Sequence, residues 1–230
     1  MSMEKQDAFL NKIANRLGRP RRSGVRPPDW EAKPYVHLYE GKTQEDLIQQ
    51  FMDNLEALNT PVDRIYRSEI TSTLESVLQG FGVKSTIFWD DQVFHDLKLA
   101  DHLREKGIKT VEWNTTGSPM ELRREAAQVD LGIAWGDIGL AETGTVVLFN
   151  GGGRGRVVSL LPPAFLCILS EKSIVPRLTQ AVQQVHSKIP DGLPSCINFI
   201  TGPSRTGDIE MDLALGVHGP GKVYVILLKD

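Results

Sequence analysis

The sequence is poor in cysteine, and this scarcity limits the chemistry that the chain can carry alone. Two of the 230 residues are cysteines, Cys167 and Cys196. Two thiols are too few for the cysteine set that usually holds an iron–sulfur cluster, and they cannot build a disulfide framework. Both cysteines lie in apolar, strand-like runs, so we expect them to be buried free thiols.

Several other features are also missing. No apolar run is long enough to span a membrane, and the first residues lack a signal peptide's apolar region, so we expect a cytoplasmic protein. The net charge of −3 gives no reason to expect a nucleic-acid partner. The histidines and cysteines lack metal-site spacing, so we expect no bound metal. Neither a G-x-S-x-G elbow nor a Walker loop is present.

The first sixty residues are predicted to form a helical arm. Apolar residues recur at helical spacing over Glu4–Leu17 and Thr43–Leu58, and Thr43 is the expected N-cap of the second helix. Between them, Arg19–Pro34 is rich in proline and arginine, which favours an extended, solvated linker. We therefore predict that residues 1–60 form an arm on the main body or on a second copy of the chain.

Residues 61–230 are predicted to form an α/β domain. Strands are expected at 84–89, 109–113 and 131–135, with helices at 69–78, 95–106 and 118–129. This alternation predicts a mostly parallel sheet flanked by helices. Further strands are expected at 165–169, 196–200 and 223–228, and a helix at 176–188.

A glycine-rich segment, Asn150–Gly155, interrupts this alternation. We expect it to be the tip of a hairpin that joins strands at 145–149 and 156–161. A phosphate loop is the alternative interpretation, although the dinucleotide and Walker motifs are absent. In either case Arg154 and Arg156 would place positive charge beside the glycines.

The first candidate site lies in Gly136–Asn150, where polar residues precede a predicted strand. Glu142, Thr143 and Thr145 surround Gly144, whose lack of a side chain would leave room for a ligand. Buried polar groups are costly unless they are paired. Their partner is either a small molecule or acyl group, or the local backbone of a turn.

The second candidate site, Gly202–Glu210, follows a predicted strand and is expected to open a helix. Free N–H groups at such a junction could bind a ligand, and Arg205 could hold its carboxylate. Alternatively, Ser204 or Thr206 caps the helix while Asp208 complements its dipole. We expect this segment and Glu142 to converge over the carboxyl edge of one sheet.

The third candidate site is the loop Gly216–Gly221, just before the last predicted strand. It places His218 between glycines, where the side chain could act as a proton donor. Turn geometry explains the glycines and Pro220 equally well.

Taken together, these segments resemble the lactate utilisation protein C family of bacteria. The resemblance spans nearly the whole chain, and several linked motifs in order are more specific than any one alone. The motifs are Phe9–Pro20, Gly139–Thr145, Ser159–Pro162, Pro194–Asn198, Gly202–Glu210 and Gly216–Pro220. Gly207 departs from the pattern, because alanine is expected there.

The resemblance implies a fold like that of glucosamine-phosphate isomerase, ribose-phosphate isomerase and the coenzyme A transferases. It also implies a role in a three-protein system that oxidises L-lactate to pyruvate. Partner proteins would hold the iron–sulfur clusters, and this chain would have no intrinsic cofactor. It would bind a carboxylate or its partners through Thr143, Gly144, Thr145, Ser204, Arg205, Thr206 and Asp208, with Glu142 and His218 as candidate catalytic residues.

Whether the chain is itself an enzyme stays open at this point. The rival hypothesis is a free-standing acyl-CoA transferase with Glu142 as nucleophile, or a sugar-phosphate isomerase with Glu142 as base. The argument for Glu142 rests on analogy of fold.

Overall fold

The computed structural model describes residues 3–22, 24, 36–114, 116, 118–209 and 212–229. Contacts divide the chain into a short unit, Met1–Glu40, and a large unit, Gly41–Asp230. The short unit contains helix α1 (Met3–Arg16) and the 3-10 helix η1 (Val36–Tyr39). Within it, Arg21 forms an ion pair with Asp7 at 2.7 Å. The helix predicted at the start of the sequence is therefore present.

A six-stranded sheet forms the centre of the large unit, and every neighbouring pair in it is parallel. Its inner strands are almost entirely apolar, as expected for strands that are covered on both faces. The predicted α/β fold with a mostly parallel sheet is confirmed. In spatial order the strands are β1 (Val62–Tyr66), β12 (Lys222–Lys229), β7 (Ala164–Ser170), β4 (Leu131–Gly136), β2 (Ser85–Trp89) and β3 (Lys109–Trp113).

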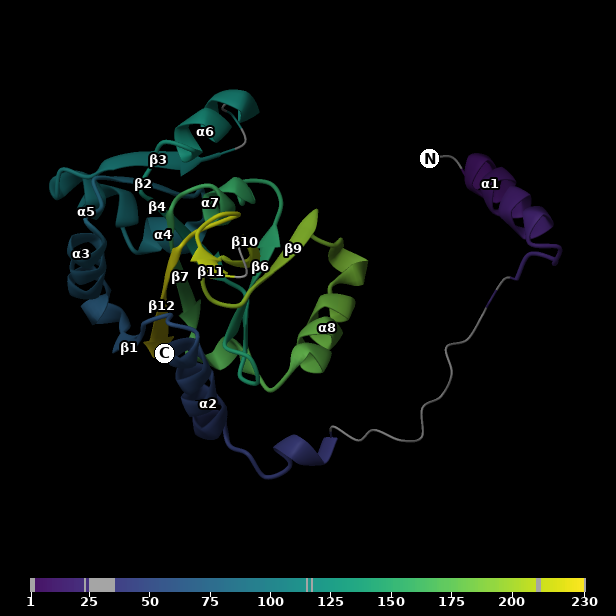
Figure 1. Ribbon diagram of the computed structural model, residues 1–230, viewed down its shortest axis with the longest axis horizontal. Coiled ribbons are helices and arrows are strands. Elements are labelled where there is room, and N and C mark those ends of the chain that lie inside the picture. The colour runs from purple at the N-terminus through teal and green to yellow at the C-terminus, as the bar shows by residue number, and fades with distance from the viewer. Residues whose placement is uncertain are drawn as a thin grey trace. The chain divides into compact units, whose positions relative to one another are not determined.

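Helices connect these parallel strands. In Figure 1, α3 and α5 lie on one side of the six-stranded sheet, and a second sheet with α8 lies on the other. The single helix predicted over residues 95–106 is wrong, because Lys98 adopts a left-handed φ of 49° and separates α4 from α5. The connecting elements are η2 (Arg67–Glu69), α3 (Ile70–Phe81), α4 (Gln92–Asp96), α5 (Leu99–Glu105) and α6 (Pro119–Ala126).

The second sheet has four strands in the order β8, β5, β6 and β9. The chain passes from the first sheet to the second at Asp137, which lies between β4 and β5. Apolar side chains of this sheet and of α8 form a buried cluster that includes Ile138, Val147 and Ala181. The elements are β5 (Ile138–Leu140), β6 (Thr145–Asn150), η3 (Glu171–Ser173), β8 (Ile174–Val175), α8 (Leu178–Ser187), η4 (Ile189–Asp191) and β9 (Cys196–Ile200).

Helix α2 (Gln44–Ala57) belongs to the large unit, although it falls within the arm predicted over residues 1–60. Thr43 caps it as predicted, by accepting a hydrogen bond from Asp46 N. Its apolar face is buried, and Asn54 Nδ2 donates to the carbonyl oxygens of Ala141 and Glu142 at 2.8 and 3.1 Å. The helix therefore helps to fix the turn that carries Glu142.

Two elements differ from the sequence predictions. The segment expected as a strand at 156–161 contains helix α7 (Val157–Leu160), and β6 pairs with β5 and β9 instead. The helix expected after Ser204 is replaced by an antiparallel pair, β10 (Arg205–Ile209) and β11 (Asp212–Leu215). In the first case β6 pairs with β9, a distant strand that a local pattern does not reveal. In the second case a local hairpin forms where capping chemistry favoured a helix.

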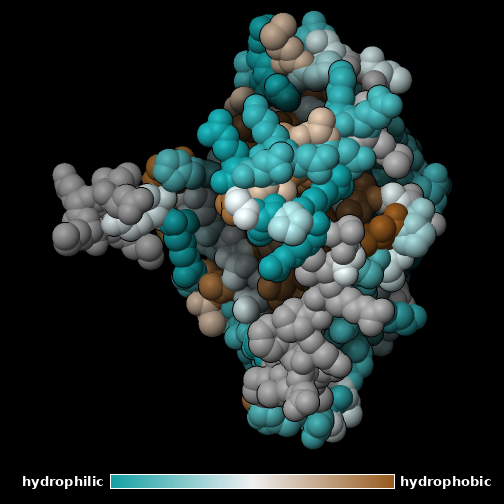
Figure 2. All heavy atoms as spheres, turned by 90° about the vertical axis from the view of Figure 1, so that its right-hand side faces the viewer, coloured by the Kyte–Doolittle hydropathy of each residue, from teal (hydrophilic) through white to brown (hydrophobic). Residues whose placement is uncertain are grey.

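The described helices include none with the length and apolarity needed to cross a membrane. Figure 2 shows one face of the molecule, on which hydrophilic side chains cover most of the coloured surface and hydrophobic ones appear as separate spots. Scattered apolar residues of this kind are normal on protein surfaces.

Candidate functional site

A chain of three hydroxyl groups connects two of the predicted site segments. Thr145 Oγ1 lies 2.6 Å from Thr143 Oγ1 and 2.7 Å from Thr201 Oγ1. Thr145 is buried, while Thr143 and Thr201 are exposed. The partners of the buried hydroxyl are thus protein groups, and Thr201 extends the chain toward the loop that begins at Gly202.

A hydrogen-bonded frame around Ser204 joins the second and third predicted segments. Ser204 N donates to Pro220 O at 2.8 Å, and Ser204 O accepts from Gly216 N at 2.9 Å. Ser204 Oγ accepts a longer bond of 3.3 Å from His218 N. Residues that lie fourteen positions apart are therefore held side by side.

This frame borders a cavity of about 300 Å³, which we call the His218 cleft. Arg205 and His218 are its ionisable residues, and both are exposed. One guanidinium N–H of Arg205 donates to Leu58 O, which leaves further donors of the fork for a ligand. The cleft is lined by Ser159, Leu160, Phe165, Phe199, Ile200, Thr201, Gly202, Ser204, Arg205, His218, Gly219, Pro220 and Val223.

The His218 cleft lies at the opposite edge of the main sheet from the one predicted. Phe165 and Val223, which line it, are the second residues of β7 and β12. The cleft is therefore near the amino ends of these parallel strands, and the expected convergence over the carboxyl edge is wrong. The reason is that β9, which precedes this segment, belongs to the second sheet and pairs antiparallel with β6, so its end does not lie at the carboxyl edge of the main sheet.

Glu142 does not join this cleft. Its carboxylate accepts a hydrogen bond from Arg177 Nε at 2.8 Å, and its backbone N–H donates to Pro176 O. Glu142 is absent from the residues that line the His218 cleft. A catalytic role for Glu142 stays a prediction, and this ion pair gives the rival transferase and isomerase hypotheses no geometric support.

Gly144 allows close packing of helix α2, whereas the sequence predicts space for a ligand beside it. It adopts a left-handed φ of 60°, and a Cβ there would lie 2.8 Å from Leu55 N and 2.9 Å from Asn54 C. Backbone of α2 therefore occupies the space beside the glycine. Thr206 pairs with Ala214 in the β10–β11 hairpin. Asp208 is part of β10, but its side chain lies outside the described residues.

An ion cluster that was not predicted from the sequence lies at the carboxyl edge of the main sheet. Strand order reverses between β2 and β4, and ligands of open α/β sheets commonly bind at such a switch point. Arg154 enters there from the glycine-rich segment, and its guanidinium lies 2.5 Å from Asp91 and 2.8 Å from Asp137. Acidic residues directly after two buried strands were the signal that could have revealed it.

Burial and ion pairing have opposite effects on the pKa values of Asp137 and Arg154 in this cluster. Burial raises the pKa of Asp137, although the N–H of Phe149 and the guanidinium of Arg154 stabilise its carboxylate. Burial also disfavours the charge on Arg154, but Asp137 and Asp91 outweigh this effect and raise the pKa of the guanidinium. The cluster consequently anchors the glycine-rich turn to the sheet.

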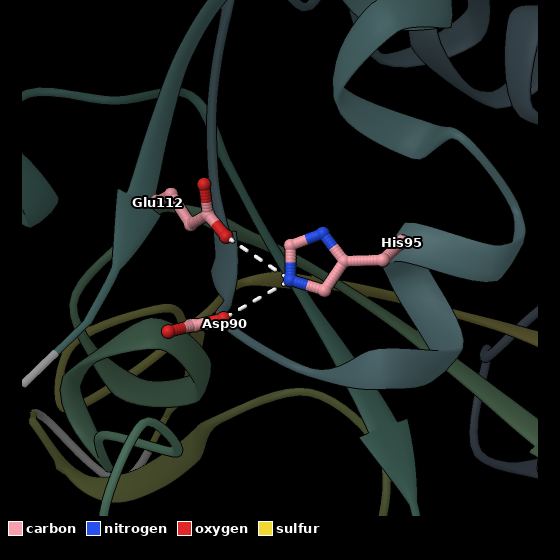
Figure 3. A group of neighbouring side chains, drawn as sticks. All are labelled: Asp90, His95 and Glu112. Carbon is pink, nitrogen blue, oxygen red and sulfur yellow. Dashed lines mark hydrogen bonds and ion pairs between the residues drawn. The ribbon is translucent and has the colours of Figure 1, made fainter.

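A second group at this edge combines Asp90, His95 and Glu112 (Figure 3). His95 Nε2 lies 3.0 Å from Asp90 Oδ1 and 3.6 Å from Glu112 Oε1. The hydrogen bond with the Asp90 carboxylate, together with the negative charge of Glu112, raises the pKa of His95. These residues have metal-ligand chemistry, but Asp90 and His95 are exposed, and exposed acidic groups are common without a metal ion.

The two cysteines are free in the structure, as predicted. Cys167 is buried, and burial raises the pKa of its thiol, which makes it a poor nucleophile. Cys196 is partly exposed, and its Sγ donates to Asn198 Oδ1 at 3.2 Å. The prediction of burial therefore holds for Cys167 alone.

Comparison with known proteins agrees with this architecture. The sequence model of the LUD domain family matches residues 48–228. Lactate utilization protein C 1 of Bacillus mycoides is 38% identical over all of this chain and 99% of its own length. The chain belongs to the lactate utilization protein C family. Lactate utilization protein C of Geobacillus sp. is 39% identical over the whole chain, and that of Bacillus subtilis is 37% identical, each over 98% of its own length.

A solved structure has a similar fold. A DUF162 family protein from Deinococcus radiodurans aligns with a TM-score of 0.60 over 81% of this chain and 99% of its own length. Its sequence identity is 18%, so the comparison concerns the fold. The helices and parallel sheet described above are therefore shared with an experimentally determined protein.

Proposed function

We propose that this chain is the non-redox component of a three-protein bacterial system that oxidises L-lactate to pyruvate. The observation that carries the proposal is its similarity, along the whole chain, to relatives named lactate utilization protein C. The chain has two cysteines, and one of them is buried with a raised pKa. Iron–sulfur clusters and electron transfer are accordingly assigned to partner proteins, which this chain binds.

The proposed ligand is a small carboxylate, bound in the His218 cleft. Arg205 offers a guanidinium fork, which suits two carboxylate oxygens. His218 and the hydroxyls of Ser204 and Thr201 line the same cavity and can bond a substituent on the neighbouring carbon. Apolar residues complete the wall, as is usual in small-molecule sites.

Growth on L-lactate tests this function. A strain without the gene should fail to grow on L-lactate, and the wild-type gene should restore growth. Arg205→Gln should restore it poorly, while Arg104→Gln, which changes an exposed arginine outside the cleft, should restore it fully. Normal growth of the deletion strain would refute the role in lactate use.

Purification with the neighbouring gene products distinguishes an effect on assembly from an effect on ligand binding. The isolated chain should show no iron–sulfur absorption, whereas the co-purified assembly should show it. If Arg205→Gln assembles with the partners but supports no growth, ligand binding is affected. If it fails to assemble, the arginine contributes to the partner interface, and the carboxylate site is wrong.

A further inference from the structure

A second cavity, of about 570 Å³, borders the glycine-rich turn. We call it the arginine cleft, because three arginines line it. It is separate from the His218 cleft, although Leu160 of α7 borders both. The lining residues are Trp113, Arg123, Asn150, Gly151, Gly152, Arg154, Gly155, Arg156, Val157, Leu160, Leu161 and Ser195.

The charge of this cleft is positive. Arg154 is neutralised by Asp91 and Asp137. Arg123 and Arg156 are exposed, and the side chain of neither forms an ion pair or hydrogen bond with another described residue. The described lining contains no carboxylate. Two arginines therefore line the cavity without a counter-charge from the described part of the chain.

A buried acceptor in the same cleft lacks a donor. Asn150 is 2% exposed, and its Nδ2 donates to Arg154 O at 3.3 Å. Its Oδ1 accepts no hydrogen bond from the described residues. An unmet buried acceptor is costly, and a ligand that carries a hydroxyl or amine could supply the donor.

The glycine-rich turn shapes the wall beside an aromatic ring. A Cβ on Gly155 would lie 2.1 Å from Trp113 Cε2, so glycine allows the backbone to contact the indole. Trp89 Nε1 fixes this turn by donating to Gly155 O at 2.9 Å. The turn therefore holds Trp113 at the edge of the cavity, where an aromatic or sugar group could pack against it.

We infer that the arginine cleft binds an organic phosphate of nucleotide size. Guanidinium groups match phosphate oxygens and carry the charge needed for a multiply charged anion. The cavity falls within the range of small-molecule sites and is nearly twice the volume of the His218 cleft. The hydroxyls of such a ligand would satisfy Asn150 Oδ1. This inference does not depend on the proposed role in lactate oxidation.

Calorimetric titration of the full chain with ADP at low ionic strength tests the inference. ADP should bind saturably, and added salt should weaken binding. Arg123→Gln and Arg156→Gln should each weaken it by roughly tenfold or more, as expected for loss of a charge-assisted bond. Arg124→Gln is the matched control, because Arg124 is an exposed neighbour in α6 that does not line the cleft.

Citrate distinguishes an organic phosphate from a carboxylate polyanion, and pyrophosphate distinguishes it from a bare phosphate. ADP should bind more tightly than either. Equal affinity for citrate would refute the phosphate class, and equal affinity for pyrophosphate would refute contact with the rest of the nucleotide. Absence of saturation at millimolar ADP, or an equal loss in Arg124→Gln, would overturn the site.

Discussion

The two clefts border the same short helix, α7, but they differ in charge and in the strand ends that surround them. The His218 cleft lies near the amino ends of β7 and β12 and contains one arginine. The arginine cleft reaches Trp113, at the carboxyl end of β3, and contains three. Ser159 of α7 lines the first, and Val157 lines the second. Helix α7 thus forms part of the wall of both clefts, and its position should matter to both proposed ligands.

The largest effect is expected from Gly132→Ala, which disturbs this common wall. A Cβ at Gly132 would lie 1.8 Å from Val158 O, a backbone atom, so α7 would have to move. We expect the free energy of unfolding to fall by about 3 kcal/mol or more, with weaker binding in both clefts. Urea denaturation measures the loss.

Gly80→Ala provides the control for Gly132→Ala. It lies in α3, and a Cβ there meets nothing within 4 Å. Alanine should stabilise this helix by about 0.5–1 kcal/mol. Equal denaturation midpoints for the two variants would contradict the close contact between β4 and α7.

Arg154→Gln is expected to have the next largest effect, confined to the arginine cleft. It leaves Asp91 and Asp137 without their cation, which should cost about 3 kcal/mol. Arg156→Gln, two residues along and exposed, should change stability by less than about 0.5 kcal/mol. A similar cost for both variants would show that the cluster does not anchor the turn.

The decrease in the free energy of unfolding caused by Arg154→Gln should depend on pH. Burial already raises the pKa of Asp137, and loss of the cation should raise it further. A raised carboxyl pKa favours the folded state below the unfolded pKa, and this advantage disappears as the pH rises through the folded pKa. The deficit of the variant should therefore shrink on acidification, as denaturation at several pH values would show.

A smaller effect is expected for the pair of Glu142 and Arg177, which lies outside the His218 cleft. Glu142→Gln should lower the free energy of unfolding by about 1 kcal/mol or less, because both side chains are partly exposed. A double-mutant cycle with Arg177→Gln measures their coupling. Growth on L-lactate should persist, and its loss in a fully folded Glu142→Gln protein would restore the catalytic hypothesis.

The smallest effect concerns His95 at the carboxyl edge. Its pKa is raised by Asp90 and Glu112, so its contribution to stability is present below the unfolded pKa and disappears as the pH rises through the folded pKa. Titration by NMR should show a pKa above the ordinary value, and Asp90→Asn should lower it. An unchanged pKa in that variant would refute the interaction.

Local signals predicted much of the fold. Apolar periodicity and capping located α2, and short apolar runs located β3 and β9 at the observed residues. These elements were predictable because neighbouring residues determine them.

The sites were harder to predict, because long-range pairing places them. The sequence identified Ser204, Arg205 and His218, and the structure brings them to one cleft. It could not show that β10 returns as a hairpin, nor that β6 pairs with β9. These pairings decide which sheet edge each segment reaches, and they separate Glu142 from the other candidates. The Asp91–Arg154–Asp137 cluster likewise depends on strand order.

The most direct test is NMR titration of the purified chain with L-lactate and with pyruvate. We expect saturable shifts of the backbone amides of the non-proline residues in 201–205 and 216–221. Shifts at 150–156 should be smaller or absent, and Arg205→Gln should abolish the response. Shifts centred on the arginine cleft, or saturable binding that survives Arg205→Gln unchanged, would contradict the assignment of the small carboxylate to the His218 cleft.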